Sequence, residues 1–136
     1  MDDCVFCRIV RGEIPSTRVW EDDLTVAFMD IGSVNPGHLL VATKAHVENL
    51  YELDERTAAA VMQSVARVGR ALRSALSPDG LSLYQANGVA AGQTVFHFHV
   101  HVLPRWKGDP MDLVWPVRNP ARQELEDTAA RIRAAL

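Results

Sequence analysis

Three histidines stand at alternate positions in one apolar segment, VFHFHVHVLPR, which occupies residues 95–105. Alternate side chains of a β-strand share one face and lie about 6.5–7 Å apart, so His97, His99 and His101 are predicted to form a row. The phenylalanines and valines between them form the opposite face, which is predicted to lie on the core. This division leaves the three histidines on a surface or in a cleft, where imidazole groups can do chemistry.

A strand face that is merely solvated does not need histidine, since lysine, threonine or glutamate would serve equally well. The row therefore indicates chemistry, and two kinds fit it. The first is a catalytic metal site, since imidazole is a common zinc ligand and a set of three histidines leaves an open position. The second is a nucleophilic imidazole whose neighbours hold its tautomer and supply protons. Three histidines in a straight row span too far for a single ion, and the row suits an extended substrate better.

The loop before the histidine segment favours an anionic substrate. Gly88 and Gly92 flank this loop, and Gly92-Gln93-Thr94 leads directly into the predicted strand. Glycine permits a close approach of the backbone, so that backbone N–H groups can bind an oxyanion. The side chains of Gln93 and Thr94 add further donors. Arg105 either adds a positive charge or faces solvent.

The elements that must position these residues follow from the periodicity of apolar side chains. The clearest is a helix over about residues 55–76, which is capped by Asp54 and ended by the turn sequence SPDG at residues 77–80. Its apolar side recurs at spacings of three and four residues: Ala58, Val61, Met62, Val65, Val68, Leu72 and Leu76. A short helix is predicted over residues 4–11, and strands over residues 19–21, 25–29, 38–42, 81–86 and 95–103.

A second substantial helix is predicted near the C-terminus. Asn119 can cap it and Pro120 suits its first turn. Acidic residues come early in this segment and arginines come late, which complements the helix dipole. Its apolar stripe is predicted to be buried and consists of Leu125, Ala129, Ile132 and Leu136.

Together these elements predict one α+β domain over residues 1–136. An antiparallel sheet of about five strands is expected, with the long helix packed on one face and the C-terminal helix at the end of the chain.

Composition excludes several classes of function. The net charge is −3 and no basic stripe is present, so binding to nucleic acid through phosphate neutralisation is not expected. No apolar run approaches the ~20 residues of a membrane span. The chain opens with the acidic sequence MDDC, unlike a secretory signal, which predicts a cytoplasmic protein. In that reducing compartment, the spacing of Cys4 and Cys7 favours metal binding or redox chemistry over a structural disulfide.

Taken together, these motifs resemble the histidine triad (HIT) family of nucleotidyl hydrolases and transferases. The signature of that family is His-φ-His-φ-His-φ-φ, where φ is apolar, and residues 97–103 fit it at every position. The N-terminal segment over residues 4–15, CVFCRIVRGEIP, resembles the zinc-containing bacterial branch of the family. Four further matches are residues 27–31, Gly37-His38, His46 and residues 92–96, whereas the tail beyond about Trp106 matches only loosely.

The resemblance implies a role for each catalytic histidine. His99, the middle histidine of the signature, would be the nucleophile that attacks the α-phosphorus of a nucleotide. His101 and His38 would line the phosphate and orient or protonate around it. Thr94 would help to stabilise the phosphoryl oxygens. The three histidines of the row would thus have different tasks.

The resemblance also implies a purine nucleotide as the substrate. Asp30 would accept hydrogen bonds from the ribose hydroxyls. Asn87, Gln93 and Thr94 would contact the phosphate or the leaving group, with Gly92 beside them. From the residues themselves, the stretch from Trp106 to Trp115 is a candidate for the leaving-group pocket, and Gly108-Asp109-Pro110 suggests a mobile loop there. The alternative for both tryptophans is packing or a dimer contact.

The resemblance further implies a structural zinc ion held by Cys4, Cys7, His46 and His97. Such a set fills the tetrahedral shell of zinc and leaves no position for water. The alternative is an unliganded cysteine pair that is buried or redox-active.

The activity implied is hydrolysis or transfer at the α-phosphate of adenosine 5′-phosphoramidates or related conjugates, through a covalent nucleotidyl-histidine and without a catalytic metal. The alternatives are hydrolysis of dinucleoside polyphosphates, a zinc-stabilised nucleotide-binding adaptor with little turnover, and a metalloenzyme of the alternating-histidine kind. The family usually forms homodimers with a sheet that continues across the interface, so a homodimer is expected here.

Overall fold

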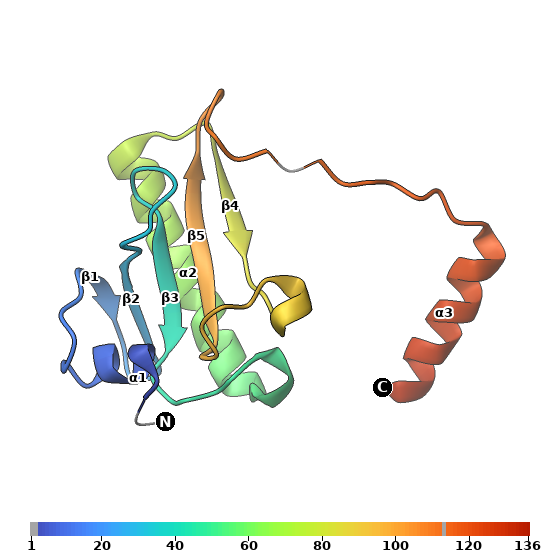
Figure 1. Ribbon diagram of the computed structural model, residues 1–136, viewed down its shortest axis with the longest axis horizontal. Coiled ribbons are helices and arrows are strands. Elements are labelled where there is room, and N and C mark those ends of the chain that lie inside the picture. The colour runs from blue at the N-terminus through green and yellow to red at the C-terminus, as the bar shows by residue number, and fades with distance from the viewer. Residues whose placement is uncertain (1–2, 113) are drawn as a thin grey trace.

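A five-stranded antiparallel sheet with a long helix across one face forms the body of the molecule (Figure 1). The computed structural model describes residues 3–112 and 114–136. The prediction of a cytoplasmic protein used the acidic sequence MDDC, of which Met1 and Asp2 lie outside the described residues. The strand order in the sheet is β1-β2-β3-β5-β4. This arrangement confirms the predicted α+β fold.

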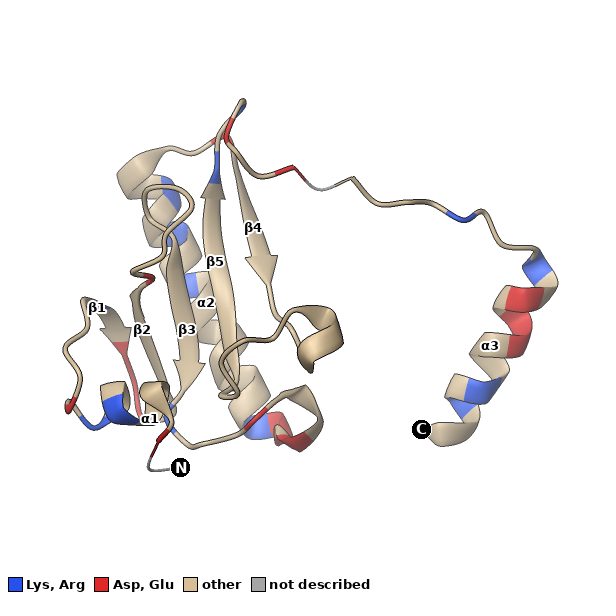
Figure 2. Ribbon diagram, in the orientation of Figure 1, with Lys and Arg blue, Asp and Glu red and all other residues tan. Residues whose placement is uncertain are grey.

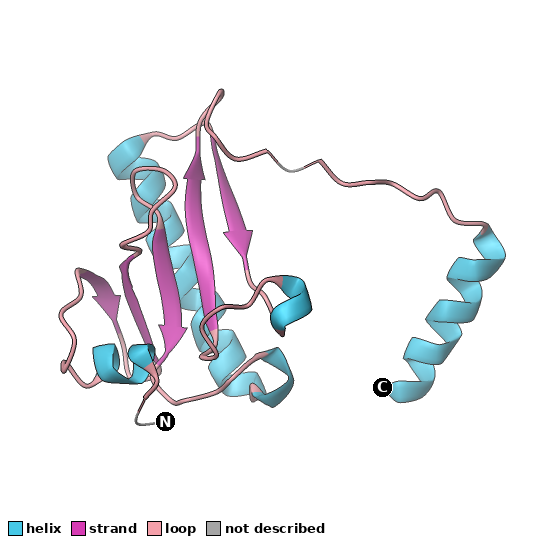
Figure 3. Ribbon diagram, in the orientation of Figure 1, coloured by secondary structure: helices cyan, strands magenta, loops and turns pink. Residues whose placement is uncertain are grey.

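The described residues contain five strands, three α-helices and two short 3₁₀ helices (Figure 3). The strands are β1 (Arg18–Glu21), β2 (Thr25–Met29), β3 (Leu39–Thr43), β4 (Gly80–Tyr84) and β5 (His99–Arg105). The α-helices are α1 (Val5–Val10), α2 (Glu55–Leu76) and α3 (Arg122–Ala135). The 3₁₀ helices are η1 (Leu50–Glu52) and η2 (Val89–Ala91). No described helix is long and apolar enough to cross a membrane.

Both faces of the sheet are covered, because neighbouring residues of a strand point to opposite sides. On one face, Val41 of β3 and Val100 of β5 pack with Val61 of α2 in a buried cluster. On the other face, Leu40 of β3 packs with Phe6 of α1 in a second cluster. His99 and His101 alternate with Val100, so they point to the face that carries α1.

The histidine segment departs from the prediction at its beginning. β5 starts at His99, whereas a strand was expected from residue 95. Before it, the backbone N–H of Phe98 donates to the carbonyl of Val47 at 2.6 Å, so the chain turns away from the regular ladder. This turn buries His97 completely and leaves Phe96 40% exposed. His97 therefore does not lie in a surface row, and Phe96 does not face the core.

The C-terminal helix also differs from the prediction. It begins at Arg122 with Ala121 at its N-cap, because Asn119 takes a left-handed conformation (φ 55°) and Pro120 stays outside the helix. Its apolar stripe is not buried within this chain, since Leu125 is 55% and Ile132 is 59% exposed. We call residues 114–136 the C-terminal arm. The arm runs away from the sheet and carries α3 at its end, where acidic residues follow the initial Arg122 and further arginines lie near the end of the helix (Figure 2).

Candidate active site and metal centre

His99 occupies the first position of β5, opposite Ala42 of β3. Its Nδ1 lies 2.6 Å from the carbonyl oxygen of His97. Because a carbonyl can only accept, Nδ1 carries the proton and Nε2 keeps a free lone pair. Burial lowers the pKa of His99, although the bond to His97 and the charge of Asp30 oppose this effect. The ring is therefore neutral at neutral pH, and Nε2 is available as a nucleophile.

A hydrogen-bonded chain of two further imidazoles lies beside His99. The backbone N–H of Val34 donates to Nδ1 of His38 at 3.1 Å, so the proton of the neutral His38 ring is on Nε2. That atom lies 2.9 Å from Nδ1 of His101. His38 therefore donates to His101, and the neutral His101 ring carries its own proton on Nε2. The site thus pairs a free lone pair on His99 with an N–H donor on His101.

A carboxylate completes this cluster. Oδ2 of Asp30 lies 3.3 Å from Nε2 of His38 and 3.7 Å from Nδ1 of His101. Burial lowers the pKa of His38, an effect that Asp30 opposes. Burial and the neighbouring His99 and His38 lower the pKa of His101 to about 4. Both rings are therefore neutral at neutral pH and able to form the chain just described.

A cavity of about 230 Å³ opens beside these imidazoles. His99 and His101 line it from β5, and Gly92, Gln93 and Thr94 line it from the loop after η2. Five of the residues predicted from the sequence therefore meet in one cavity. Its composition suits a phosphate group, since it combines imidazoles, a threonine hydroxyl and a loop glycine at positive φ.

Two of the predicted substrate-binding amides are engaged within the protein. Gln93 accepts from the backbone N–H of Gly88 at 2.7 Å and donates to the carbonyl of Glu48 at 2.8 Å, which fixes the loop. Asn87 accepts from the backbone N–H of Leu50 at 2.7 Å and also bonds to Gln85. Asn87 does not line the cavity.

The predicted zinc ligands converge at the other end of the histidine segment. Sγ of Cys7 lies 3.3 Å from Nδ1 of His46 and 3.5 Å from Nδ1 of His97, and Sγ of Cys4 lies 3.4 Å from Nδ1 of His97. All four donor atoms lie within 4.8 Å of one another. A tetrahedron with zinc bonds of the usual length has sulfur–nitrogen edges of about 3.5 Å. The four residues therefore fit a zinc ion.

Two contacts prepare these donors for a metal. Nε2 of His97 lies 2.6 Å from the carbonyl of Thr43, so the proton is on Nε2 and the lone pair of Nδ1 is directed at the sulfurs. The backbone N–H of Cys7 donates to Sγ of Cys4 at 3.5 Å. Burial and the nearby Cys4 raise the pKa of Cys7, which favours the protonated thiol of this residue until a cation is bound.

The segment after β5 is anchored rather than mobile. Arg105 donates to both carboxylate oxygens of Asp109, at 2.7 and 2.9 Å, and Asn35 donates to the same group at 2.9 Å. These bonds hold the pKa of Asp109 well below its usual range. Arg105 is thereby engaged outside the cavity lined by His99 and His101. Trp115, on the arm, is 80% exposed in the single chain.

The sequence interpretation missed Phe6 as a residue of the site. Its ring contacts the ring of His99, with centroids 4.9 Å apart and planes at 82°. The position of Phe6 between the two cysteines was the available signal, because a residue inside a metal-binding turn must lie near the metal.

Comparison with known proteins places this geometry in a family. A family model described as the HIT domain matches residues 11–108. Protein hit of Bacillus subtilis is 44% identical over 115 residues, which cover 84% of this chain and 79% of that protein. Adenosine 5′-monophosphoramidase hnt1 of Schizosaccharomyces pombe is 36% identical over 102 residues, which cover 75% of this chain and 74% of that protein. The chain belongs to the histidine triad family of nucleotide-binding hydrolases and transferases.

Solved structures agree with this assignment. The crystal structure of a HIT family protein from Bacillus anthracis superposes with a TM-score of 0.95 at 35% identity, covering 99% of this chain and 98% of that chain. A Zn-bound histidine triad family protein from Mycobacterium smegmatis superposes with a TM-score of 0.77 at 36% identity, covering 99% of each chain. A score of 0.95 over nearly the whole chain includes the C-terminal arm, so the Bacillus anthracis protein shares its extended position.

Proposed function

We propose that the protein hydrolyses purine nucleoside 5′-phosphoramidates, with adenosine as the nucleoside, through a covalent nucleotidyl-histidine. The observation that carries this proposal is the pairing of protonation states in the cavity: Nε2 of His99 keeps a lone pair, and Nε2 of His101 carries a proton. A nucleophile and a donor that face one cavity are the two groups that a displacement at phosphorus requires. The phosphoramidase hnt1 among the relatives supports the choice of substrate.

In the first step, the lone pair on Nε2 of His99 attacks the α-phosphorus and the phosphorus–nitrogen bond breaks. The leaving nitrogen takes its proton from a water molecule, which becomes hydroxide, while the N–H on Nε2 of His101 donates a hydrogen bond to the departing amine and His38 holds His101 in this tautomer. In the second step, water attacks phosphorus and the bond to His99 breaks, which releases the nucleoside monophosphate. The lone pair returns to Nε2 of His99, and the proton from water restores the starting state.

The surrounding residues stabilise charge and hold the substrate. The hydroxyl of Thr94 donates to the phosphoryl oxygens from the loop side of the cavity, where the lack of a side chain at Gly92 lets the substrate approach the backbone. Asp30 binds the ribose hydroxyls through Oδ2, since its Oδ1 already accepts from the backbone N–H of Gly32 at 2.8 Å. None of these steps routes through a metal.

Zinc would be held by Cys4, Cys7, His46 and His97, where it supplies a cross-link between α1 and the sheet. The donor spacing described above and the zinc-bound relative from Mycobacterium smegmatis support this assignment. A reducing compartment such as the cytoplasm would keep both thiols available for the metal.

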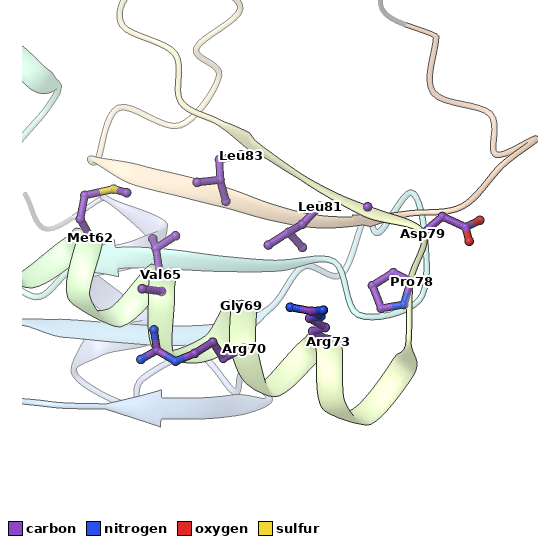
Figure 4. A pocket seen from close by; sticks show the side chains of 11 residues that line it. Met62, Val65, Gly69, Arg70, Arg73, Pro78, Asp79, Leu81 and Leu83 are labelled. Carbon is purple, nitrogen blue, oxygen red and sulfur yellow. The ribbon is translucent and has the colours of Figure 1, made fainter.

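We also propose that residues 1–136 act as one domain that pairs with a second copy along β4. This strand lies at the edge of the sheet, and its Leu81 and Leu83 are 42% and 45% exposed. Figure 4 shows these two leucines pointing toward α2, with Met62 and Val65 on the helix opposite them. The groove between them has a volume of about 610 Å³. An open strand edge beside an apolar groove suits continuation of the sheet into a partner.

The test is release of AMP from adenosine 5′-phosphoramidate by the wild type and by His99→Ala. We expect turnover by the wild type and a loss of at least about a thousandfold in the variant, because the nucleophile is removed. Wild-type protein quenched by denaturation at alkaline pH, where the phosphorus–nitrogen bond survives, should carry labelled nucleotide on His99. The unfolding midpoint of the variant verifies that it is folded.

The other outcomes separate the alternatives. Turnover of diadenosine polyphosphates without turnover of the phosphoramidate would replace the proposed substrate with the polyphosphate class. Tight binding of AMP with no turnover of either compound would contradict the enzymatic proposal and leave a nucleotide-binding adaptor.

A further inference from the structure

The short helix α1 belongs to both the metal centre and the active site. Cys4 is its N-cap and Cys7 lies in its first turn, so both predicted sulfur ligands come from one end of this helix. Phe6 lies between them and is buried. Its ring stands edge-on to His99 at 4.9 Å and to His97 at 5.8 Å between centroids.

A second connection joins the two sites through the backbone. Nδ1 of His97 faces the sulfurs, while the carbonyl oxygen of the same residue accepts the Nδ1 proton of His99 at 2.6 Å. One residue is therefore both a metal ligand and the group that fixes the nucleophile. The ring of His99 is therefore held by two groups. Its Nδ1 bonds to the backbone carbonyl of His97, which is a predicted metal ligand, and the ring itself contacts the ring of Phe6, which lies in the sequence between the predicted ligands Cys4 and Cys7.

The two ends of α1 are anchored by different means. At the C-terminal end, the guanidinium of Arg18 donates to the carbonyls of Ile9 and Val10 at 2.7 and 3.1 Å. At the N-terminal end, Cys4 accepts from the backbone N–H of Arg8 at its carbonyl, at 3.1 Å, and from the N–H of Cys7 at its Sγ, at 3.5 Å. A helix of six residues is far too short to be stable by itself. The end that carries Phe6 is therefore held by the packing of its ring on Phe28, with centroids 5.4 Å apart, and by the cysteines and what they bind.

We propose that Phe6 is a positioning residue for His99, and that occupation of the Cys4–Cys7 metal centre holds Phe6 in place. The metal centre thereby keeps the imidazole ring of His99 in one orientation, in addition to stabilising the fold. This inference deepens the proposed function and rests on it for the role of His99 as the nucleophile. Loss of the metal would release the N-terminal end of α1 and loosen the ring of His99, while Arg18 retains the other end.

The first test compares zinc-loaded Phe6→Ala with zinc-loaded Ile9→Ala. Ile9 is the matched control because it is buried in the same cluster and on the same helix but has no aromatic ring. Both variants should retain one zinc ion per chain and lose similar stability. Only Phe6→Ala should lower kcat for AMP release, by about tenfold to a hundredfold with a nearly unchanged KM, as expected for a misplaced nucleophile. Phe6→Leu should give an intermediate kcat.

The second test needs no turnover. Nitrogen and proton NMR of the His99 ring should show one fixed tautomer, with Nδ1 protonated, in zinc-loaded wild type and in Ile9→Ala. In Phe6→Ala and in wild type stripped of zinc by a chelator, the Nδ1 proton should exchange faster and the ring signals should broaden.

Unchanged His99 signals in both Phe6→Ala and the zinc-free protein would overturn the inference, whatever the activity. If the NMR response is as expected but the phosphoramidate is not cleaved, the proposed function fails and the coupling stands. Equal effects of Phe6→Ala and Ile9→Ala on kcat and on the His99 signals would reduce Phe6 to an ordinary core residue.

Discussion

At the scale of single residues, the main chain assigns the protons of the site. His99 donates to a carbonyl, His38 accepts from a backbone N–H, and His97 donates to the carbonyl of Thr43. Each of these contacts fixes one ring nitrogen and thereby sets the state of the other. Backbone groups cannot rotate away as side chains can, so each neutral ring keeps its tautomer, with the proton on Nδ1 in His99 and on Nε2 in His38 and His97. The arrangement explains how adjacent histidines perform different tasks.

The first prediction concerns His101 and acid pH. Its pKa is about 4 in the folded protein and about 6.5 in the unfolded chain, so the unfolded chain binds the proton first as the pH falls. The contribution of His101 to the free energy of unfolding is therefore fully present above pH 6.5 and is lost progressively toward about pH 4. Urea unfolding of the wild type should show this loss, and His101→Asn should show a shallower decline. Both proteins keep the metal ligands, so acid release of metal affects them equally. Parallel declines would contradict the assignment.

The second prediction concerns Asp30 and the sugar. If Oδ2 of Asp30 accepts from the ribose, the wild type should cleave a ribonucleoside phosphoramidate about tenfold or more faster, in kcat/KM, than the 2′-deoxy compound. Asp30→Asn should lose most of this preference because the amide is a weaker acceptor. An unchanged preference in the variant would remove Asp30 from the ribose site.

At the scale of elements, the long helix α2 was predictable from the sequence, whereas the irregular turn before β5 was not. Apolar periodicity and the cap at Asp54 predicted the bounds of α2, and Asp54 accepts from the backbone N–H of Thr57 at 2.8 Å as a cap should. The turn at residues 95–98 has no local signal, because its cause is the bond to Val47 in a distant segment. The alternation of histidines predicted one face, whereas this turn sends His97 to the metal centre and His99 to the cavity.

The third prediction concerns Gly37, which precedes His38 and brings its strand into the sheet. Its φ is +85°, and an added Cβ would lie 2.5 Å from Cδ1 of Leu76. Gly37→Ala should therefore reduce the free energy of unfolding by about 2–4 kcal/mol, from backbone strain and overpacking together. Gly12→Ala is the control, since its φ is +76° with nothing within 4 Å, and strain alone should cost about 1–2 kcal/mol. Urea unfolding measures both, and equal losses would show that packing at Gly37 is unimportant.

At the scale of the whole molecule, the C-terminal arm is the feature that a single chain leaves unexplained. The stripe on α3 was expected to be buried because its periodicity is that of a packed helix, yet its leucines and isoleucine are exposed in this chain. Periodicity shows that a face needs a partner without showing which molecule provides it. The proposed second copy supplies a partner for this stripe as well as for the open edge of β4.

The fourth prediction follows for the arm. Leu125→Glu combined with Ile132→Glu should weaken the dimer at least about tenfold, because two charges enter an apolar contact. Ala130→Glu combined with Ala134→Glu adds the same charge on the opposite side of α3 and should leave the dimer intact. Light scattering over a dilution series, with the 15.0 kDa chain as the unit, gives the masses. A monomeric wild type, or equal behaviour of the two variants, would contradict this role for α3.

The strand order also determines when the sheet can be completed while the chain is being synthesised. β1, β2 and β3 are neighbours in both sequence and sheet, so they can pair as soon as Thr43 has been made. β3 must then wait for β5, and β4 joins the sheet only through β5. Three of the four metal donors are translated by His46, whereas the fourth is His97. A growing chain therefore closes its metal centre and seats its nucleophile in one late event, and a product that stops short of His97 has neither.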